Sequence, residues 1–211
     1  MTWWPVALLL VALAASLLAG LLRSSRAGTA AASLPVATVG IALLTAAGAA
    51  AQAAFPSLLG LMERDSVRIA AGEIWRVGTA LLVQDGGLPG TVFNLGCLVA
   101  VGTIAERLWG PAKWLLLYFG CGIAAELIAL AWQPVGAGNS IAVMALAGSL
   151  CALGASGGGR ALLPALAGLS CGLALAAMRD IHGGALLLGA LAGGLLSLSG
   201  RRAANPGASS L

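Results

Sequence analysis

The sequence predicts an all-α, polytopic membrane protein whose helices form a bundle. Of its 211 residues, 60% are hydrophobic and only 9% are charged, whereas a soluble domain carries about 25% charged residues. Seven stretches are apolar and long enough to cross a membrane, since about 20 helical residues span its hydrocarbon core. They cover residues 4–22, 34–55, 88–106, 112–132, 139–157, 161–178 and 182–199.

The first stretch is interpreted as a retained helix, with a cleaved signal peptide as the alternative. No basic region precedes it, and Arg23 and Arg26 follow where a signal peptide has small residues. The chain is therefore divided into an N-terminal transmembrane helix with a cytoplasmic link (1–30), a membrane domain (31–200) and a cytoplasmic tail (201–211). The tail is predicted to be disordered, because it is rich in small and polar residues.

The basic residues predict the orientation of the helices. Seven spans bring four segments to the same side, and these segments carry Arg23, Arg26, Arg107, Lys113, Arg160, Arg201 and Arg202. Cytoplasmic loops are enriched in Lys and Arg, so the N-terminus is predicted outside and the C-terminus inside, in the plasma membrane of a bacterium. Topology then explains the net charge of +4, and no nucleic-acid partner is expected.

The longest connection, residues 56–87, mixes apolar and charged residues. It is predicted to lie in the headgroup region at the outer face. The six tryptophans fall near predicted interfaces and are interpreted as aromatic belts. The last three spans are rich in Ala, Gly and Leu, and small residues let helix backbones approach closely. Most of the 31 glycines are therefore interpreted as packing surface.

Ser140 and His182 are the residues that suggest chemistry. They begin the fifth and seventh spans, which both start at the predicted outer face, and His182 is the only histidine. A neutral imidazole within hydrogen-bond reach turns a serine hydroxyl into a nucleophile. No carboxylate is obviously placed to complete a triad, and Asp180 is expected in the loop, so a dyad is predicted. For each residue alone, a helix-capping or packing role is the alternative.

Acyl transfer also requires hydrogen-bond donors for the oxyanion. The predicted donors are the amide of Asn94, in the outer half of the third span, and the backbone N–H of Ser140, in the first turn of its helix. An interhelical hydrogen bond is the alternative for Asn94. No metal or other cofactor is expected, since none of the cysteines shows metal-ligand spacing. They are Cys97, Cys121, Cys151 and Cys171.

Several short motifs lie between residues 73 and 194. Their residues are Glu73, Trp75 and Arg76 in the long loop, Asn94, the pair Glu106 and Gly110, the pair Gly138 and Ser140, and finally His182 and Gly189. In order and spacing they resemble the rhomboid family of intramembrane serine proteases. The resemblance implies a six-helix core from the second to the seventh span, with the first span added. It also implies Ser140 as nucleophile, His182 as catalytic histidine, no cofactor, and a transmembrane protein as substrate.

Two residues depart from the family pattern. Ile141 stands where the Gly-x-Ser-Gly motif has its second glycine, and Gly90 stands where a histidine precedes the asparagine by four residues. A catalytically inactive rhomboid-like protein that binds membrane segments is therefore an alternative. A small transporter is a third alternative. It would be expected to show internal repeats, and the sequence shows none.

Two acidic residues fall within predicted spans, where a charge is costly. Glu106 is predicted to form a structural ion pair with Arg107 at the inner interface. Glu126 has no obvious basic partner, and Arg76, His182 and a protonated carboxyl are the alternatives.

Overall fold

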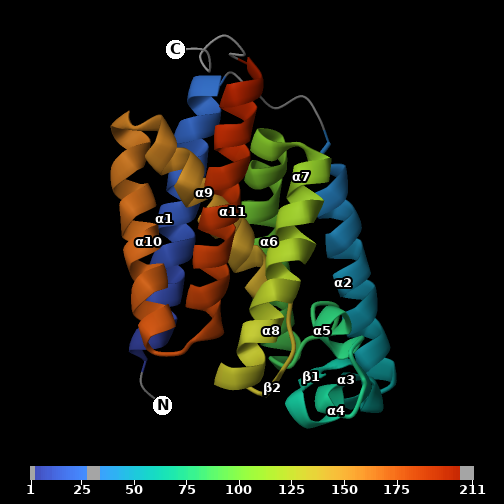
Figure 1. Ribbon diagram of the computed structural model, residues 1–211. Helices are drawn as coiled ribbons and strands as arrows, with labels where there is room; N and C mark the ends of the chain where they lie inside the picture. The colour runs from blue at the N-terminus through green and yellow to red at the C-terminus, as the bar shows by residue number, and fades with distance from the viewer. Residues whose placement is uncertain (1–2, 28–33, 205–211) are drawn as a thin grey trace.

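The computed structural model describes residues 3–27 and 34–204. Within these residues, seven helical segments are long and apolar enough to cross a membrane, which confirms the predicted number of spans. Figure 1 shows them running alternately up and down the bundle. They are α1 (Trp4–Ala27), α2 (Val36–Ala54), α6 (Gly87–Trp109), the continuous α7 (Pro111–Leu115), η1 (Leu116–Cys121) and α8 (Gly122–Trp132), then α9 (Ser140–Gly157), η2 (Gly159–Ala161) with α10 (Leu162–Ala177), and α11 (Ile181–Ala204).

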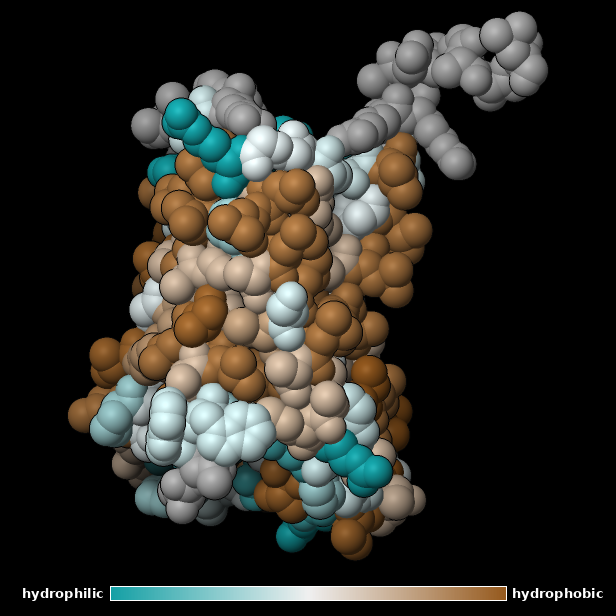
Figure 2. All heavy atoms as spheres, turned by 90° about the vertical axis from the view of Figure 1, so that its left-hand side faces the viewer, coloured by the Kyte–Doolittle hydropathy of each residue, from teal (hydrophilic) through white to brown (hydrophobic). Residues whose placement is uncertain are grey.

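The surface of the bundle fits a bilayer. Figure 2 shows a broad apolar band on the side at the left of Figure 1, with hydrophilic side chains gathered toward both ends. Such a band is unfavourable in water and matches the hydrocarbon region of a membrane. The chain is an integral membrane protein. The end of the bundle at which α1 begins, at the bottom of Figure 1, is called the N-terminal side below.

Helix α9 lies at the centre of the bundle. Every residue from Ile141 to Cys151 is buried, and α1, α6, α8, α10 and α11 all pack against it. Its contact with α11 is the closest in the fold, because a Cβ at Gly148 or Gly189 would overlap a backbone carbonyl of the other helix. Small residues thus let two helix backbones touch. The position of α9 relative to α11 is fixed as a result.

Helix α1 packs against α6, α9 and α10 through its own small residues. Ala12, Ser16 and Ala19 are fully buried on one face, and Ser16 Oγ lies 3.1 Å from Cys151 Sγ of α9. Ala12, Ser16 and Ala19 are four and three residues apart, and this spacing places their side chains on one face of a helix. The first helix is therefore packed into the bundle.

The long connection on the N-terminal side is structured. It contains α3 (Ser57–Met62), β1 (Arg64–Asp65), α4 (Ser66–Ala70) and α5 (Arg76–Thr79), all at the bottom of Figure 1. Strand β1 pairs antiparallel with β2 (Val135–Gly136), which precedes α9. The apolar side chains on its surface are Phe55, Leu61, Val67, Ile74 and Trp75. An interfacial location suits such a surface, but the small sheet was not predicted.

Arg76 holds this connection together. Its side chain is 1% exposed. The guanidinium donates from Nη1 to the carbonyls of Gly60 and Glu63, at 2.9 and 3.0 Å, and from Nε to Glu73 at 2.6 Å. Five fixed donors on one planar group allow this triple contact. Trp75, by contrast, is 56% exposed.

The two buried acidic residues have partners other than those predicted. Glu106 caps α2, accepting from the backbone amides of Ala37 and Thr38 at 2.9 and 2.8 Å, and no ion pair joins it to Arg107 within the described residues. A carboxylate at a helix N-terminus is favoured by the free amides there. Glu126 pairs with Arg64 of β1.

Two further predictions are corrected. Trp109 and Trp114 are buried and donate to Ser149 Oγ and to the Gly102 carbonyl, each at 3.0 Å, so they belong to the core and not to an aromatic belt. Helix α11 continues to Ala204, so the first residues of the predicted disordered tail are helical. The rest of that tail (205–211) and the link at 28–33 lie outside the described residues.

Candidate active site

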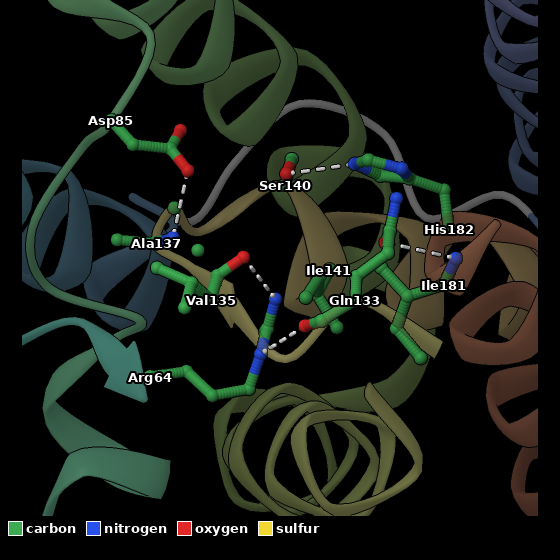
Figure 3. Close-up of a pocket in the computed structure, with 11 residues that line it drawn as sticks. Arg64, Asp85, Gln133, Val135, Ala137, Ser140, Ile141, Ile181 and His182 are labelled. Atoms are coloured by element: carbon green, nitrogen blue, oxygen red, sulfur yellow. Dashed lines mark hydrogen bonds between the residues drawn. The ribbon is translucent and has the colours of Figure 1, made fainter. Parts of the chain in front are cut away.

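Ser140 and His182 are in contact at the N-terminal side of the bundle. Ser140 is the first residue of α9, and His182 is the second of α11. Ser140 Oγ lies 3.0 Å from His182 Nε2, as the dashed line in Figure 3 marks. The imidazole side chain is 24% exposed. The close α9–α11 contact brings the beginnings of the two helices together. Two residues that are 42 positions apart in the sequence are therefore joined by a hydrogen bond.

Gly138 shapes the turn that leads to Ser140. Its φ is +144°, a conformation that residues with a Cβ rarely adopt. A Cβ built there would lie 3.5 Å from Asn94 Nδ2 and 3.6 Å from both Gln84 Oε1 and Ser140 Oγ. The Gly138 amide donates to the Ala80 carbonyl at 2.9 Å. This glycine therefore gathers Asn94, Gln84 and Ser140 around one point of the backbone.

A polar cavity of about 250 Å³ opens beside the pair. Arg64 lines it and donates to the carbonyls of Gln133 and Val135, at 2.9 and 3.5 Å, as Figure 3 shows. Asp85 Oδ2 accepts from the Ala137 amide at 2.9 Å. Both contacts fix the segment between α8 and α9, so the backbone before Ser140 is held from two sides.

A second cavity, of about 140 Å³, is also lined by Ser140 and His182 and is mainly apolar. Leu9 and Leu13 of α1 line it together with Phe93 and Asn94 of α6. Asn94 Nδ2 donates to Gln84 Oε1 at 2.8 Å. Because an amide nitrogen carries two hydrogens, one remains available on Asn94 beyond this bond.

The two departures from the family pattern leave the serine–histidine contact intact. Ile141 is 5% exposed and lines the polar cavity beside Ser140. A Cβ at Gly90 would meet no atom within 4 Å, so this position leaves open space where a side chain would stand.

Asp180 contacts the site in a way that the sequence analysis did not predict. It does lie in the loop before α11, but its Oδ1 accepts both from the backbone amide of His182, at 2.9 Å, and from ring atom Nδ1, at 2.7 Å. Burial raises the pKa of the Asp180 carboxyl, but the hydrogen bonds and charge of His182 outweigh burial and hold that pKa below its ordinary value. An Asp two positions before a residue in the first turn of a helix is a capping pattern, and this signal was available in the sequence.

The remaining motif residues lie away from the pair and support the fold. Glu73 and Arg76 bind each other in the long connection, and Glu106 caps α2. Gly110, with φ of +76°, ends α6 and permits the sharp turn into α7. Gly189 makes the α11 side of the close helix contact.

The part of the chain that the structure describes contains no cluster of metal ligands. No group of three or more His, Cys, Asp or Glu side chains could hold an ion there. The four cysteines are all free thiols.

The fold and the site together define a membrane helix bundle in which a serine and a histidine are in contact at the start of two helices. The family model described as the Rhomboid domain matches residues 71–203, more than half of the chain. The chain therefore belongs to the rhomboid family, a family of intramembrane serine proteases.

One curated relative is similar over part of the chain. The sequence is 32% identical over 95 residues to "Rhomboid protease GluP" of Bacillus subtilis (strain 168). The match covers 44% of this chain and 18% of the relative, so the chain spans less than two thirds of that protein. No solved structure matches the chain.

Proposed function

We propose that the chain is an intramembrane serine protease that cleaves transmembrane proteins through Ser140 and His182. The observation that carries the proposal is the 3.0 Å contact between Ser140 Oγ and His182 Nε2 beside a polar cavity. Membership of the rhomboid family supports the same class of enzyme. The cavity offers space beside Ser140 for the water that hydrolysis consumes.

The reaction is an acyl transfer in two halves. Ser140 Oγ attacks the scissile carbonyl carbon while its proton passes to His182 Nε2. The C–N bond breaks as that proton moves to the leaving amine. Water then attacks the acyl-enzyme, gives a proton to His182, and releases the carboxylic acid as the proton returns to Ser140. No cofactor takes part in these steps.

Two donors are proposed for the oxyanion that forms during each attack. The Ser140 amide lies in the first turn of α9, where backbone N–H groups have no helical partner. The Asn94 amide lines the apolar cavity with Ser140 and His182 and has a hydrogen beyond its bond to Gln84. Donors aimed at the developing charge are worth about 2.7–4 kcal/mol each in a comparable site.

Cleavage is proposed near the outer face of a bacterial plasma membrane. Arg107 lies in the last turn of α6, Lys113 in α7 and Arg160 in η2. These segments lie at the end of the bundle away from the start of α9. The positive-inside rule makes that end cytoplasmic, so the N-terminal side faces outward, with the N-terminus outside and the C-terminus inside. A transmembrane substrate would enter from the lipid and unwind locally, because an intact helix shields its carbonyls with its own hydrogen bonds.

The test uses purified wild-type protein in liposomes with a panel of fluorescent transmembrane substrates. Ser140→Ala and His182→Ala should each lower cleavage by at least 1,000-fold, on the order seen when a nucleophile or its base is removed, without changing the thermal unfolding temperature. Undiminished cleavage by either variant would remove the proposal.

The alternative is an inactive rhomboid-like protein that binds membrane segments. Ile141 beside the serine and the open space at Gly90 favour it. A fluorophosphonate probe separates the two: covalent labelling of Ser140 in the wild type supports the protease, and absence of labelling in folded protein supports the binding protein.

A further inference from the structure

We infer that Asp180 is a positioning residue that completes a Ser140–His182–Asp180 triad in this chain. The inference rests on the proposed function for its catalytic consequence, but its structural part can be tested without catalysis. It is carried by two consecutive contacts: Ser140 Oγ to His182 Nε2 at 3.0 Å, and His182 Nδ1 to Asp180 Oδ1 at 2.7 Å.

The carboxylate decides which ring nitrogen of His182 holds the proton. The pKa of Asp180 lies below its ordinary value, so this group is ionised at neutral pH and only accepts hydrogen bonds. The ring must then donate from Nδ1, which leaves the lone pair of Nε2 facing the Ser140 hydroxyl. That is the tautomer in which His182 can take the serine proton.

A tight turn holds Asp180 in place. Arg179 has φ of +58°, and the Asp180 amide donates back to the Leu175 carbonyl at 3.0 Å. These are the features of a helix end closed by a left-handed residue. On the far side, the Ile181 amide is 3.3 Å from Gln133 Oε1 of the α8 end. The backbone that carries Asp180 is therefore anchored both at this residue and at the next.

Helix capping is the competing explanation for Asp180. Its Oδ1 also accepts from the backbone amide of His182, in the first turn of α11. Asn and Ser cap helices about as well as Asp, but neither carries a charge. The variants Asp180→Asn and Asp180→Ser therefore both keep the cap. Asp180→Asn removes the charge beside the ring, and Asp180→Ser removes both the charge and the oxygen that reaches the ring.

Other charged groups surround His182, and the test must separate them from Asp180. Arg64 and Asp85 line the same cavity, and Glu126 of α8 is paired with Arg64. Asp85 is the matched control, because it is also a carboxylate in this cavity and its bond goes to the Ala137 amide, not to the ring.

The first measurement is nitrogen NMR of protein labelled with ¹⁵N in the histidine ring, in detergent near neutral pH. His182 is the only histidine, so every ring signal reports on this residue. The expected wild-type spectrum has the proton on Nδ1, and Asp180→Ser is expected to shift the proton toward Nε2. A wild-type ring protonated on Nε2, or an unchanged tautomer in Asp180→Ser, would overturn the inference whether or not the protein is active.

The second measurement is the rate of labelling of Ser140 by a fluorophosphonate between pH 5 and 9. In this reaction Ser140 Oγ bonds to phosphorus, fluoride leaves, and the hydroxyl proton passes to His182. Asp180→Asn should lower the plateau rate by about 100-fold or more and move the acidic limb of the profile to lower pH, because the carboxylate no longer stabilises the protonated ring. Asp85→Asn should leave that limb within about 0.3 pH unit of the wild type, the smaller effect expected of a more distant charge.

The outcomes distinguish the two proposals. A wild type without labelling removes the protease, and the ring spectrum still decides the triad geometry. A labelled wild type together with an Asp180→Asn variant of equal rate and equal pH profile leaves Asp180 as a helix cap only, and overturns the inference.

Discussion

Two sides of the candidate site are held by different kinds of contact. On one side, α9 and α11 touch backbone to backbone at Gly148 and Gly189. On the other, the long connection and the segment before α9 are held by Arg76 and by Arg64, whose guanidinium groups bind carbonyls and carboxylates. We call the first the glycine contact and the second the arginine contacts.

The two kinds of contact differ in how well they tolerate amino-acid substitutions. A helix carbonyl cannot move away from an added Cβ without displacing the whole helix, so the glycine contact accepts no larger side chain. An arginine contact depends on its partners, and loss of one partner leaves a buried charge or carbonyl that a second substitution can relieve. Substitutions at the glycine contact should therefore be irreparable, whereas those at the arginine contacts should be rescued in pairs.

The largest effect is expected from Gly189→Val. Its side chain would overlap the Ala145 carbonyl, and the cost should exceed the roughly 1–3 kcal/mol of ordinary overpacking, because backbone must shift. We expect loss of most folded protein by size-exclusion chromatography in mild detergent. Gly194→Ala on the same helix is the control, since its Cβ meets nothing within 4 Å. A folded Gly189→Val protein of unchanged unfolding temperature would contradict the comparison.

The next effect is expected from Glu126→Leu. It leaves the guanidinium of Arg64, 3% exposed, without its buried counter-charge, at a cost of about 3–5 kcal/mol. Addition of Arg64→Met should recover part of that loss, measured by thermal unfolding in detergent. Arg68→Met is the control: this arginine is 52% exposed, lies 3.6 Å from Asp65, and should change stability by less than about 1 kcal/mol. A double variant less stable than Glu126→Leu would argue against rescue in pairs.

A moderate effect is expected from Arg76→Lys. Lysine keeps the charge but cannot reach Glu73 and the carbonyls of Gly60 and Glu63 together, so about 1–3 kcal/mol of stability should be lost. Faster proteolysis within residues 56–87 would show that the connection has loosened. Unchanged proteolysis would mean that Arg76 does not hold it.

The smallest effect concerns Asp180 and pH. The pKa of the Asp180 carboxyl is lower in the folded protein than the ordinary value of about 3.9 for an aspartate. The ionised carboxylate therefore stabilises the folded protein fully above that ordinary value. This stabilisation is lost as the pH falls through the lower pKa of the folded state. The wild type should therefore unfold at a higher temperature than Asp180→Ala at pH 7, with the gap narrowing toward pH 3. A gap that stays constant with pH would show that the charge is not involved.

Much of the fold was predictable because the bilayer imposes it. Helices that cross lipid must be continuous, apolar and about 20 residues long, so the seven spans were visible in the sequence. Their alternating direction then put Ser140 and His182, each at the start of an odd-numbered span, on the same side of the membrane. The polar connections were less predictable, and the pairing of β1 with β2 joins segments about 70 residues apart.

The site itself was only half predictable. Hydropathy says at which depth a residue lies but not toward which neighbour it points, and for this reason Glu126 was not matched with Arg64, nor Trp109 with Ser149. Asp180 was missed for another reason: its bond to the ring forms within three residues, but only after the turn at Arg179 fixes its direction.

The amino-acid sequence by itself determined the membrane environment, the number of spans and the common depth of Ser140 and His182, because these follow from local hydrophobicity and chain direction. Only the tertiary structure decided which faces of the helices meet. The rotation of each helix about its axis depends on close packing between distant segments, as Gly148 against α11 and Arg64 against Glu126 illustrate.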